Sequence, residues 1–178
     1  MRIMARRYQY ERITARQLSD AFNDVGIKSV DQFCRISGAG ERTVRRWLDG
    51  SENIPHYVAV LCTLLTMPGA MQEARAVSEA RLIENPDATA RRYQHTRMTH
   101  RQLSAVLNRL DLSMRKFARL TGAAERTVDR WLRGVEDIPH YVTLLCSLLT
   151  IPGAMAKAKA VADAMVIPET DDEDETDA

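Results

Sequence analysis

The chain contains one sequence pattern twice, and this duplication restricts how it can fold more than any other feature. Residues 6–9, Arg-Arg-Tyr-Gln, recur at 91–94, an offset of 85 residues. From about residue 30 the offset is 84, so that Ile-Pro-His-Tyr-Val at 54–58 recurs at 138–142. Each copy has the length of a small domain, and the turn-forming Asn85-Pro86-Asp87 lies between them. The sequence therefore predicts one domain over 1–85 and a second over 86–167.

Each copy has the apolar spacing of five helices. In the second copy, three leucines fall on one face and predict a helix over 100–110, with Thr99 as its N-cap. Further helices are predicted over 114–121, 124–133, 139–149 and 154–166. The first copy has the same pattern from Thr14 to about Leu82. Runs of β-branched residues are few, so we expect an all-α chain.

Charge is distributed unevenly along the chain. The formal net charge is only +1, yet residues 169–178 hold seven acidic and no basic residues, which leaves 25 Lys and Arg against 17 Asp and Glu elsewhere. We predict a disordered acidic tail over 168–178, which solubilises the chain, covers basic faces or recruits another protein. The arginine pairs at 6–7 and 91–92 are either phosphate or minor-groove contacts or solvated linker charges. The basic remainder suits a polyanionic partner.

Several classes of protein are disfavoured by the sequence. No apolar stretch is long enough to cross a bilayer, and residues 1–7 lack the hydrophobic segment of a secretory signal, so we expect a cytoplasmic protein. Cys34, Cys62 and Cys146 are odd in number and form no CxxC pair, which predicts buried thiols rather than disulfides or a zinc site. No phosphate loop, nucleophile triad or metal motif is present, so we expect no enzyme, cofactor or small-molecule ligand.

Two repeated residue types have both a packing and a functional interpretation. Trp47 and Trp131 could stack on bases, but each shares a helical face with a valine three residues earlier, which favours the core. His56 and His140 follow the prolines that open the fourth helices, and no carboxylate or cysteine lies at ligand spacing beside them. We expect these histidines to pack at the helix start or to bond a phosphate rather than to hold a metal.

The second and third predicted helices of each copy carry a shared pattern. A glycine stands in the turn, a small residue lies within the first helix, and valine and tryptophan occupy the inner face of the second. These residues are Gly38, Cys34, Val44 and Trp47 in one copy and Gly122, Ala118, Val128 and Trp131 in the other. The segments 33–55 and 117–139 resemble the Cro/repressor-like (XRE-type) helix-turn-helix family, especially its short bacterial and phage regulators. The resemblance implies two tandem five-helix helix-turn-helix domains, each inserting its third helix into the major groove of double-stranded DNA.

By this resemblance, the DNA-binding residues are those exposed by the third helix of each copy. They are Gly40, Glu41, Arg42, Thr43, Arg45, Arg46 and Asp49 in the first copy, and Ala124, Glu125, Arg126, Thr127, Asp129, Arg130 and Arg133 in the second. Arg42 and Arg126 are the leading candidates to read guanine, because one arginine can bond both O6 and N7. The family usually has serine where this chain has Gly40 or Ala124. Alanine is a poor N-cap, so we expect the first turn of the third helix in the second copy to be less stable.

Two charges are exchanged between the copies. Arg45 and Asp49 in the first correspond to Asp129 and Arg133 in the second. Each pair is spaced i, i+4, so it either forms an intrahelical ion pair or contacts bases that differ between two half-sites. The sequence leaves both alternatives open.

The resemblance implies a nucleoid-associated transcriptional regulator, with repression as the expected outcome, in which one chain covers two half-sites. The alternative is a protein-interaction module, antitoxin-like or an adaptor, which keeps the fold without reading DNA. The acidic tail and Asp129 favour that alternative, whereas the basic third helices oppose it. A homodimer through the apolar residues of the fourth and fifth helices also stays open. An RNA partner is disfavoured, because the A-form major groove does not admit a reading helix.

Overall fold

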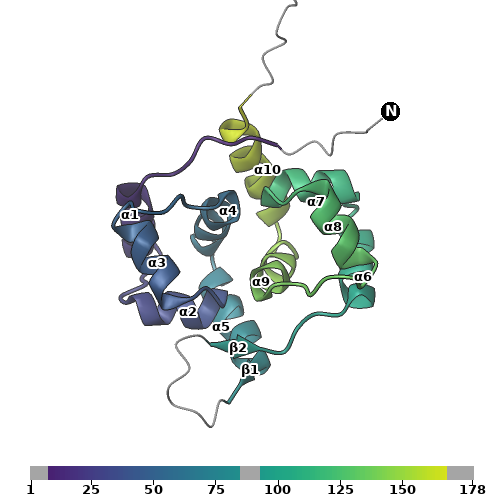
Figure 1. The fold of residues 1–178 in the computed structure, drawn as a ribbon, viewed down its shortest axis with the longest axis horizontal. Coiled ribbons are helices and arrows are strands. Elements are labelled where there is room, and N and C mark those ends of the chain that lie inside the picture. Colours follow the sequence, from purple (N-terminus) through teal and green to yellow (C-terminus); the bar gives the residue numbers. More distant parts are fainter. Residues whose placement is uncertain (1–7, 85–92, 168–178) are drawn as a thin grey trace, which may run out of the picture.

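The computed structural model describes residues 8–84 and 93–167, and this part of the chain is mostly helical, with ten helices and one two-stranded sheet (Figure 1). The first copy forms α1 (Ala15–Asp24), α2 (Val30–Ser37), α3 (Glu41–Leu48), α4 (His56–Leu65) and α5 (Ala70–Arg81). The second forms α6 (His100–Arg109), α7 (Met114–Thr121), α8 (Glu125–Leu132), α9 (His140–Leu148) and α10 (Ala154–Met165). Between the copies lie β1 (Leu82–Ile83) and β2 (Gln94–His95). The prediction of a mostly helical chain is confirmed.

Three predicted features lie outside the described residues. They are the boundary at Asn85-Pro86-Asp87, the arginine pairs Arg6, Arg7, Arg91 and Arg92, and the acidic tail over 168–178.

Local side-chain chemistry explains where the helices begin. Thr14 and Thr99 each cap the following helix by accepting a hydrogen bond from the backbone N–H of a glutamine three residues on, and that glutamine side chain accepts from the threonine N–H in return. Ser29 and Ser113 cap α2 and α7 in a similar way. One boundary is corrected: the proline expected inside the fourth helix stands just before it, because Pro139 has extended backbone and α9 begins at His140.

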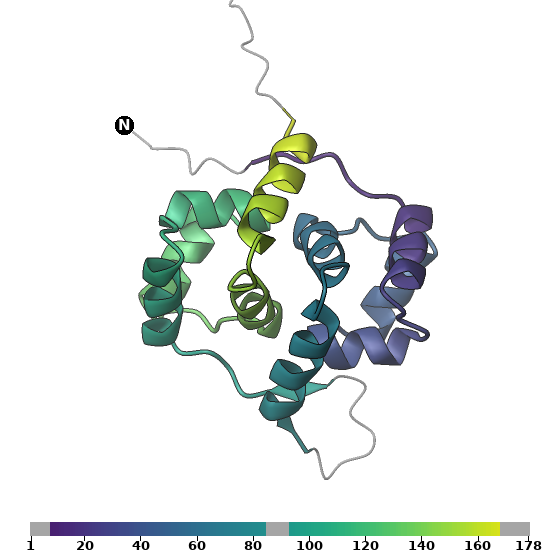
Figure 2. The ribbon, with the colours of Figure 1, turned by 180° about the vertical axis from the view of Figure 1, so that it is seen from behind.

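The two copies pack around a pseudo-two-fold axis. α4 and α9 lie side by side at the centre of the molecule (Figures 1 and 2). Tyr57 and Tyr141, which occupy equivalent positions in the repeat, stack on each other with ring centroids 3.8 Å apart. Contact between a residue and its own counterpart in the other copy indicates a two-fold interface, as in a symmetric dimer.

The last helix of each copy packs mainly on the fourth helix of the other copy. α5 lies against α9, and α10 lies against α4. Fully buried alanines, such as Ala74 on α5 and Ala158 on α10, allow this close approach. Buried apolar residues from both copies form one continuous cluster. The two copies therefore share a core.

Short strand pairings join the beginning of each copy to the end of the other. β1 and β2 are antiparallel, with Leu82 opposite His95. At the equivalent place across the axis, Tyr10 forms a bridge with Val166, the Glu11 N–H donates to the Met165 carbonyl over 2.7 Å, and the Ile167 N–H donates to the Gln9 carbonyl over 2.9 Å. The helical pattern of the sequence does not predict these pairings, which tie the copies together at two points.

Candidate nucleic-acid interface

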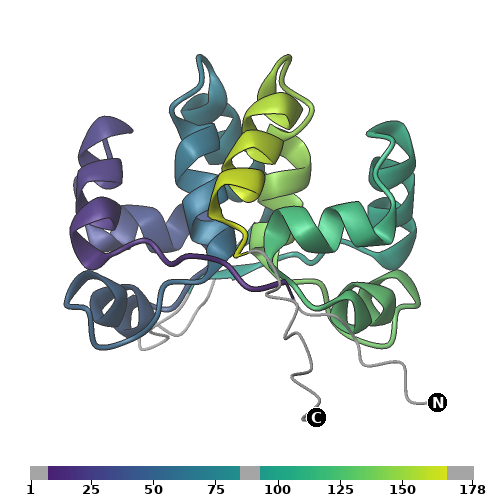
Figure 3. The ribbon, with the colours of Figure 1, turned by 90° about the horizontal axis from the view of Figure 1, so that it is seen from above.

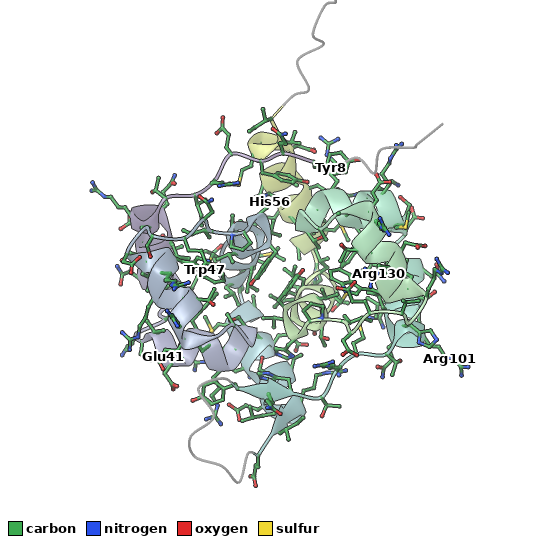
Figure 4. The ribbon with its side chains drawn as sticks, in the orientation of Figure 1. Tyr8, Glu41, Trp47, His56, Arg101 and Arg130 are labelled. Atoms are coloured by element: carbon green, nitrogen blue, oxygen red, sulfur yellow. The ribbon has the colours of Figure 1, made fainter. Side chains whose placement is uncertain are left out.

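Helices α3 and α8 lie at opposite ends of one face of the molecule (Figure 3). Each is anchored by its inner side, where Val44 and Trp47 of α3 and Val128 and Trp131 of α8 are buried. Figure 4 shows Trp47 on the side of α3 that faces α4, and Glu41 at the edge of the molecule. The core interpretation of both tryptophans is confirmed. The outer sides of α3 and α8 are left available to a partner.

The turn before each of these helices rests on the other copy. Gly38 and Gly122 end α2 and α7 with φ of 74°, a left-handed conformation that suits glycine. A Cβ on Gly122 would lie 2.8 Å from the His56 Cβ, and one on Gly38 would lie 3.1 Å from the His140 Cβ. The glycines therefore serve both the turn and the packing of the copies, and this contact fixes how α3 and α8 are placed relative to each other.

Stacked rings complete these two contacts, which we call the seams. In the first seam the Tyr10 ring stacks on His56, and in the second the His95 ring stacks on His140, each with centroids 3.6 Å apart. The His140 Nε2 lies 3.1 Å from the Ile36 carbonyl oxygen and 3.1 Å from the Ser78 Oγ. The Tyr10 hydroxyl donates to the Arg119 carbonyl. Each seam thus joins the C-terminal end of α2 or α7 to the opposite copy.

The seam histidines are neutral near pH 7. Burial lowers the pKa of His56 to about 4. Burial, with His95 beside it, lowers the pKa of His140 to about 3. Both rings pack at the starts of α4 and α9, which was one of the two roles expected for them. Over residues 8–84 and 93–167, no group of three or more His, Cys, Asp or Glu side chains could hold a metal ion.

On α3, two of the three arginines are held by acids. Arg45 pairs with Glu41 over 2.6 Å, and Arg46 pairs with Glu52 over 3.7 Å. Asp49 accepts a hydrogen bond from the Ser51 N–H over 2.8 Å instead of pairing with Arg45. The predicted ion pair between Arg45 and Asp49 is therefore wrong, because Arg45 pairs with Glu41 instead. Glu41 and Asp49 both lie four residues from Arg45, but Asp49 is engaged by Ser51 in the turn after α3.

On α8, the pattern of ion pairs differs. Arg133 pairs with Asp129 over 3.4 Å, the pairing that the spacing allows, and Arg130 pairs with Glu136 over 3.2 Å. Glu125 pairs outside its own helix, with Arg115 of α7, over 3.2 Å. The two helices therefore present different charges although their sequences nearly match.

Arg42 and Arg126 stand apart from the other arginines of α3 and α8. Both are exposed in the first turn, and neither side chain has an ion pair or hydrogen bond to any residue that the structure describes. Gly40 and Ala124 precede them as N-caps without a side-chain bond, and Thr43 and Thr127 are half-buried behind them. The exposed part of each predicted site thus centres on one guanidinium that no described residue holds in an ion pair.

Sequence reasoning missed the residues that lie between the two helices. Open hollows flank the Tyr57–Tyr141 stack, and they are lined by residues of the strand pairing and of the bridge, such as His95 and Tyr10. Hydrophobic periodicity does not mark these residues, because pairings of one or two residues have no measurable period. The substitution of His95 for Tyr10 at equivalent positions was the one visible hint, since both are aromatic.

Comparison with protein-family models, curated proteins and solved structures finds no match to the chain. No helix in the described part of the chain is long and apolar enough to span a membrane. What α3 and α8 bind must therefore be inferred from their own geometry and chemistry.

Proposed function

We propose that the chain is a sequence-specific transcriptional regulator that binds double-stranded DNA in the cytoplasm, at the nucleoid, through two helix-turn-helix units, α2–α3 and α7–α8. The observation that carries the proposal is a pair of exposed arginines, Arg42 and Arg126, at equivalent positions of two helices on one face. Neither forms an ion pair with any residue in 8–84 or 93–167. The major groove admits a helix, and arginine can bond guanine O6 and N7 together. In this proposal, the two helices on one face enter two successive major grooves.

The pseudo-two-fold packing supports a site with inverted-repeat symmetry. The Tyr57–Tyr141 stack lies between the copies, so a symmetric duplex can place its own dyad there. Half-site centres about 34 Å apart, one helical turn, would let both units bind the same side of the duplex. Because α3 and α8 carry different ion pairs, the repeat should be imperfect. A chain that covers a promoter in this way acts most simply as a repressor.

A second candidate is a protein-interaction module that keeps the fold without reading DNA. It is favoured by the pairing of Arg45, Arg46, Arg130 and Arg133 with carboxylates, which lowers the positive charge of α3 and α8. These pairs are exposed, and exposed ion pairs are worth only about 0–1 kcal/mol. A phosphate can therefore compete for the arginines, and DNA binding is the stronger candidate.

Selection from a random duplex library, followed by titration at several salt concentrations, tests the proposal. We expect a two-part sequence and an affinity that falls steeply with salt, because bound phosphates release counterions. Arg42→Ala should weaken one half of the selected site and Arg126→Ala the other, each by about 1–3 kcal/mol.

Arg75→Ala is the matched control. Arg75 is exposed on α5, which belongs to neither helix-turn-helix unit, and has no ion pair within the described residues. Its replacement should leave the selected sequence unchanged. Weak binding without any enriched sequence would contradict the proposal and favour the interaction module.

A further inference from the structure

The two DNA-binding units proposed above differ in charge although they share their helices. We define the first head as residues 14–55 and the second head as residues 99–139, and the structure describes both in full. The first head has six Lys and Arg and six Asp and Glu, whereas the second has eight and five. The first head is therefore neutral and the second carries a net charge of +3.

Part of the difference lies beside the exposed helix. At matching positions, the first head has Asp31 and Gln32 on α2, and the second head has Arg115 and Lys116 on α7. The Arg115 Nε lies 3.2 Å from a carboxylate oxygen of Glu125, in the first turn of α8, so Arg115 borders the proposed DNA surface. Lys116 is exposed and has no ion pair within the described part of the chain.

In the first head, Asp31 stands at the position of Arg115 and contacts the other copy. The Tyr93 hydroxyl, from the second copy, donates to the Asp31 carboxylate over 2.6 Å. Asp31 thus helps to join the copies, and it also places a negative charge where the second head has a positive one. The α2 position that corresponds to Arg115 is occupied by Asp31, and Glu41 pairs with Arg45 of its own helix.

We propose that the second head binds DNA phosphates more tightly than the first, so that the protein occupies an asymmetric site in one orientation. The inference rests on the proposed DNA-binding function. Phosphate contacts by Lys and Arg supply the sequence-independent part of DNA affinity, and each contact steepens the salt dependence. The second head anchors the chain, and the first head adds specificity once the chain is in place.

The test uses the full chain and duplexes in which one half of the selected site is scrambled. The half that Arg126→Ala weakens is assigned to the second head. The duplex that keeps only this half should bind about tenfold more tightly than the duplex that keeps only the other, as measured by fluorescence anisotropy. Its slope of log affinity against log salt should be steeper by about two, since each extra phosphate contact contributes about 0.9.

Exchanging residues between the heads isolates the cause. The double variant R115D/K116Q gives the second head the residues of the first and should abolish both the affinity difference and the slope difference. The control R75D/K159Q makes the same change in net charge at exposed positions on α5 and α10, and it should preserve the difference.

Equal affinities and slopes for the two half-site duplexes would overturn the inference and leave the DNA-binding proposal intact. A preference for the half assigned to the first head would also overturn it. Failure to select any sequence would contradict the DNA-binding proposal itself, and the inference with it.

Discussion

At the residue scale, Gly122 meets two demands that are normally separate. Its φ of 74° ends α7, and its missing side chain makes room for His56 of the other copy. A glycine in such a turn is expected from the sequence, because left-handed backbone stops a helix. The close approach of Gly122 to His56 is not expected from the sequence, because His56 lies 66 positions earlier in the chain.

Replacing Gly122 by alanine should therefore cost more than a left-handed glycine usually does. We expect G122A to lower the free energy of unfolding by about 3 kcal/mol, of which left-handed strain accounts for about 1. G69A is the matched control, because Gly69 has φ of 78° and nothing lies within 4 Å of its would-be Cβ. It should cost only about 1 kcal/mol. Equal losses in urea unfolding would show that the contact with His56 contributes nothing.

The seam histidines should make stability depend on pH. The folded pKa values of His56 and His140 lie below the usual 6.5, so the unfolded chain binds protons more readily than the folded one. Their contribution is fully present above pH 6.5 and is lost as the pH falls towards 4. Since both rings are partly exposed, we expect a loss of about 1 kcal/mol from each at pH 5.

Unfolding of the wild-type chain and of the double variant H56Q/H140Q, measured from pH 5 to 8, isolates this effect. The difference in stability between the two proteins should shrink as the pH falls, because the variant lacks the His56 and His140 rings and keeps only His95 in the seams. A constant difference across this range would contradict the assignment.

At the element scale, α3 and α8 lack the side-chain cap that starts their neighbours α2 and α7. A serine at the N-cap position can accept a hydrogen bond from a free N–H of the first turn. We expect A124S to stabilise the protein by about 1 kcal/mol, and G40S by only a few tenths, because glycine already caps tolerably. Thermal unfolding measures both, and a larger gain for G40S would contradict this account.

The sequence predicts elements well where their causes are local. Capping residues such as Thr99 and glycines such as Gly122 lie within a few positions of the boundaries they set, and the helix over 114–121 agrees with α7 residue for residue. The bridge between Tyr10 and Val166 joins residues far apart in the chain, and the exchange of α5 and α10 has the same long-range origin. Neither leaves a local signal.

The candidate site could be predicted in position but not in its charge pairing. That Arg42 and Arg126 are exposed follows from helical periodicity. The partner of Arg45 does not follow from periodicity, because Glu41 and Asp49 are equally spaced from Arg45. Only the turn after α3, where Ser51 bonds Asp49, decides between them.

At the scale of the whole molecule, the copies should unfold together. Each last helix covers the fourth helix of the other copy, so neither copy keeps its core without its neighbour. The chain has two tryptophans, one in each copy, and each is buried. The variants W47F and W131F therefore each keep one fluorescent reporter, from opposite copies.

Urea unfolding of W47F and W131F should show fluorescence transitions that coincide, within each variant, with the loss of helix followed by circular dichroism. Such agreement indicates one cooperative unit. A fluorescence midpoint that departs from the loss of helix, in opposite directions for the two variants, would show that the copies unfold separately.

The shared core also bears on function, because it holds α3 and α8 at a fixed separation on one face. A footprint on the selected duplex tests this central claim most directly. We expect two protected blocks on the same side of the duplex, with centres about 10 base pairs apart. Arg42→Ala should open one block and Arg126→Ala the other. A single block, or protection that neither variant alters, would contradict a molecule that reads DNA with two heads.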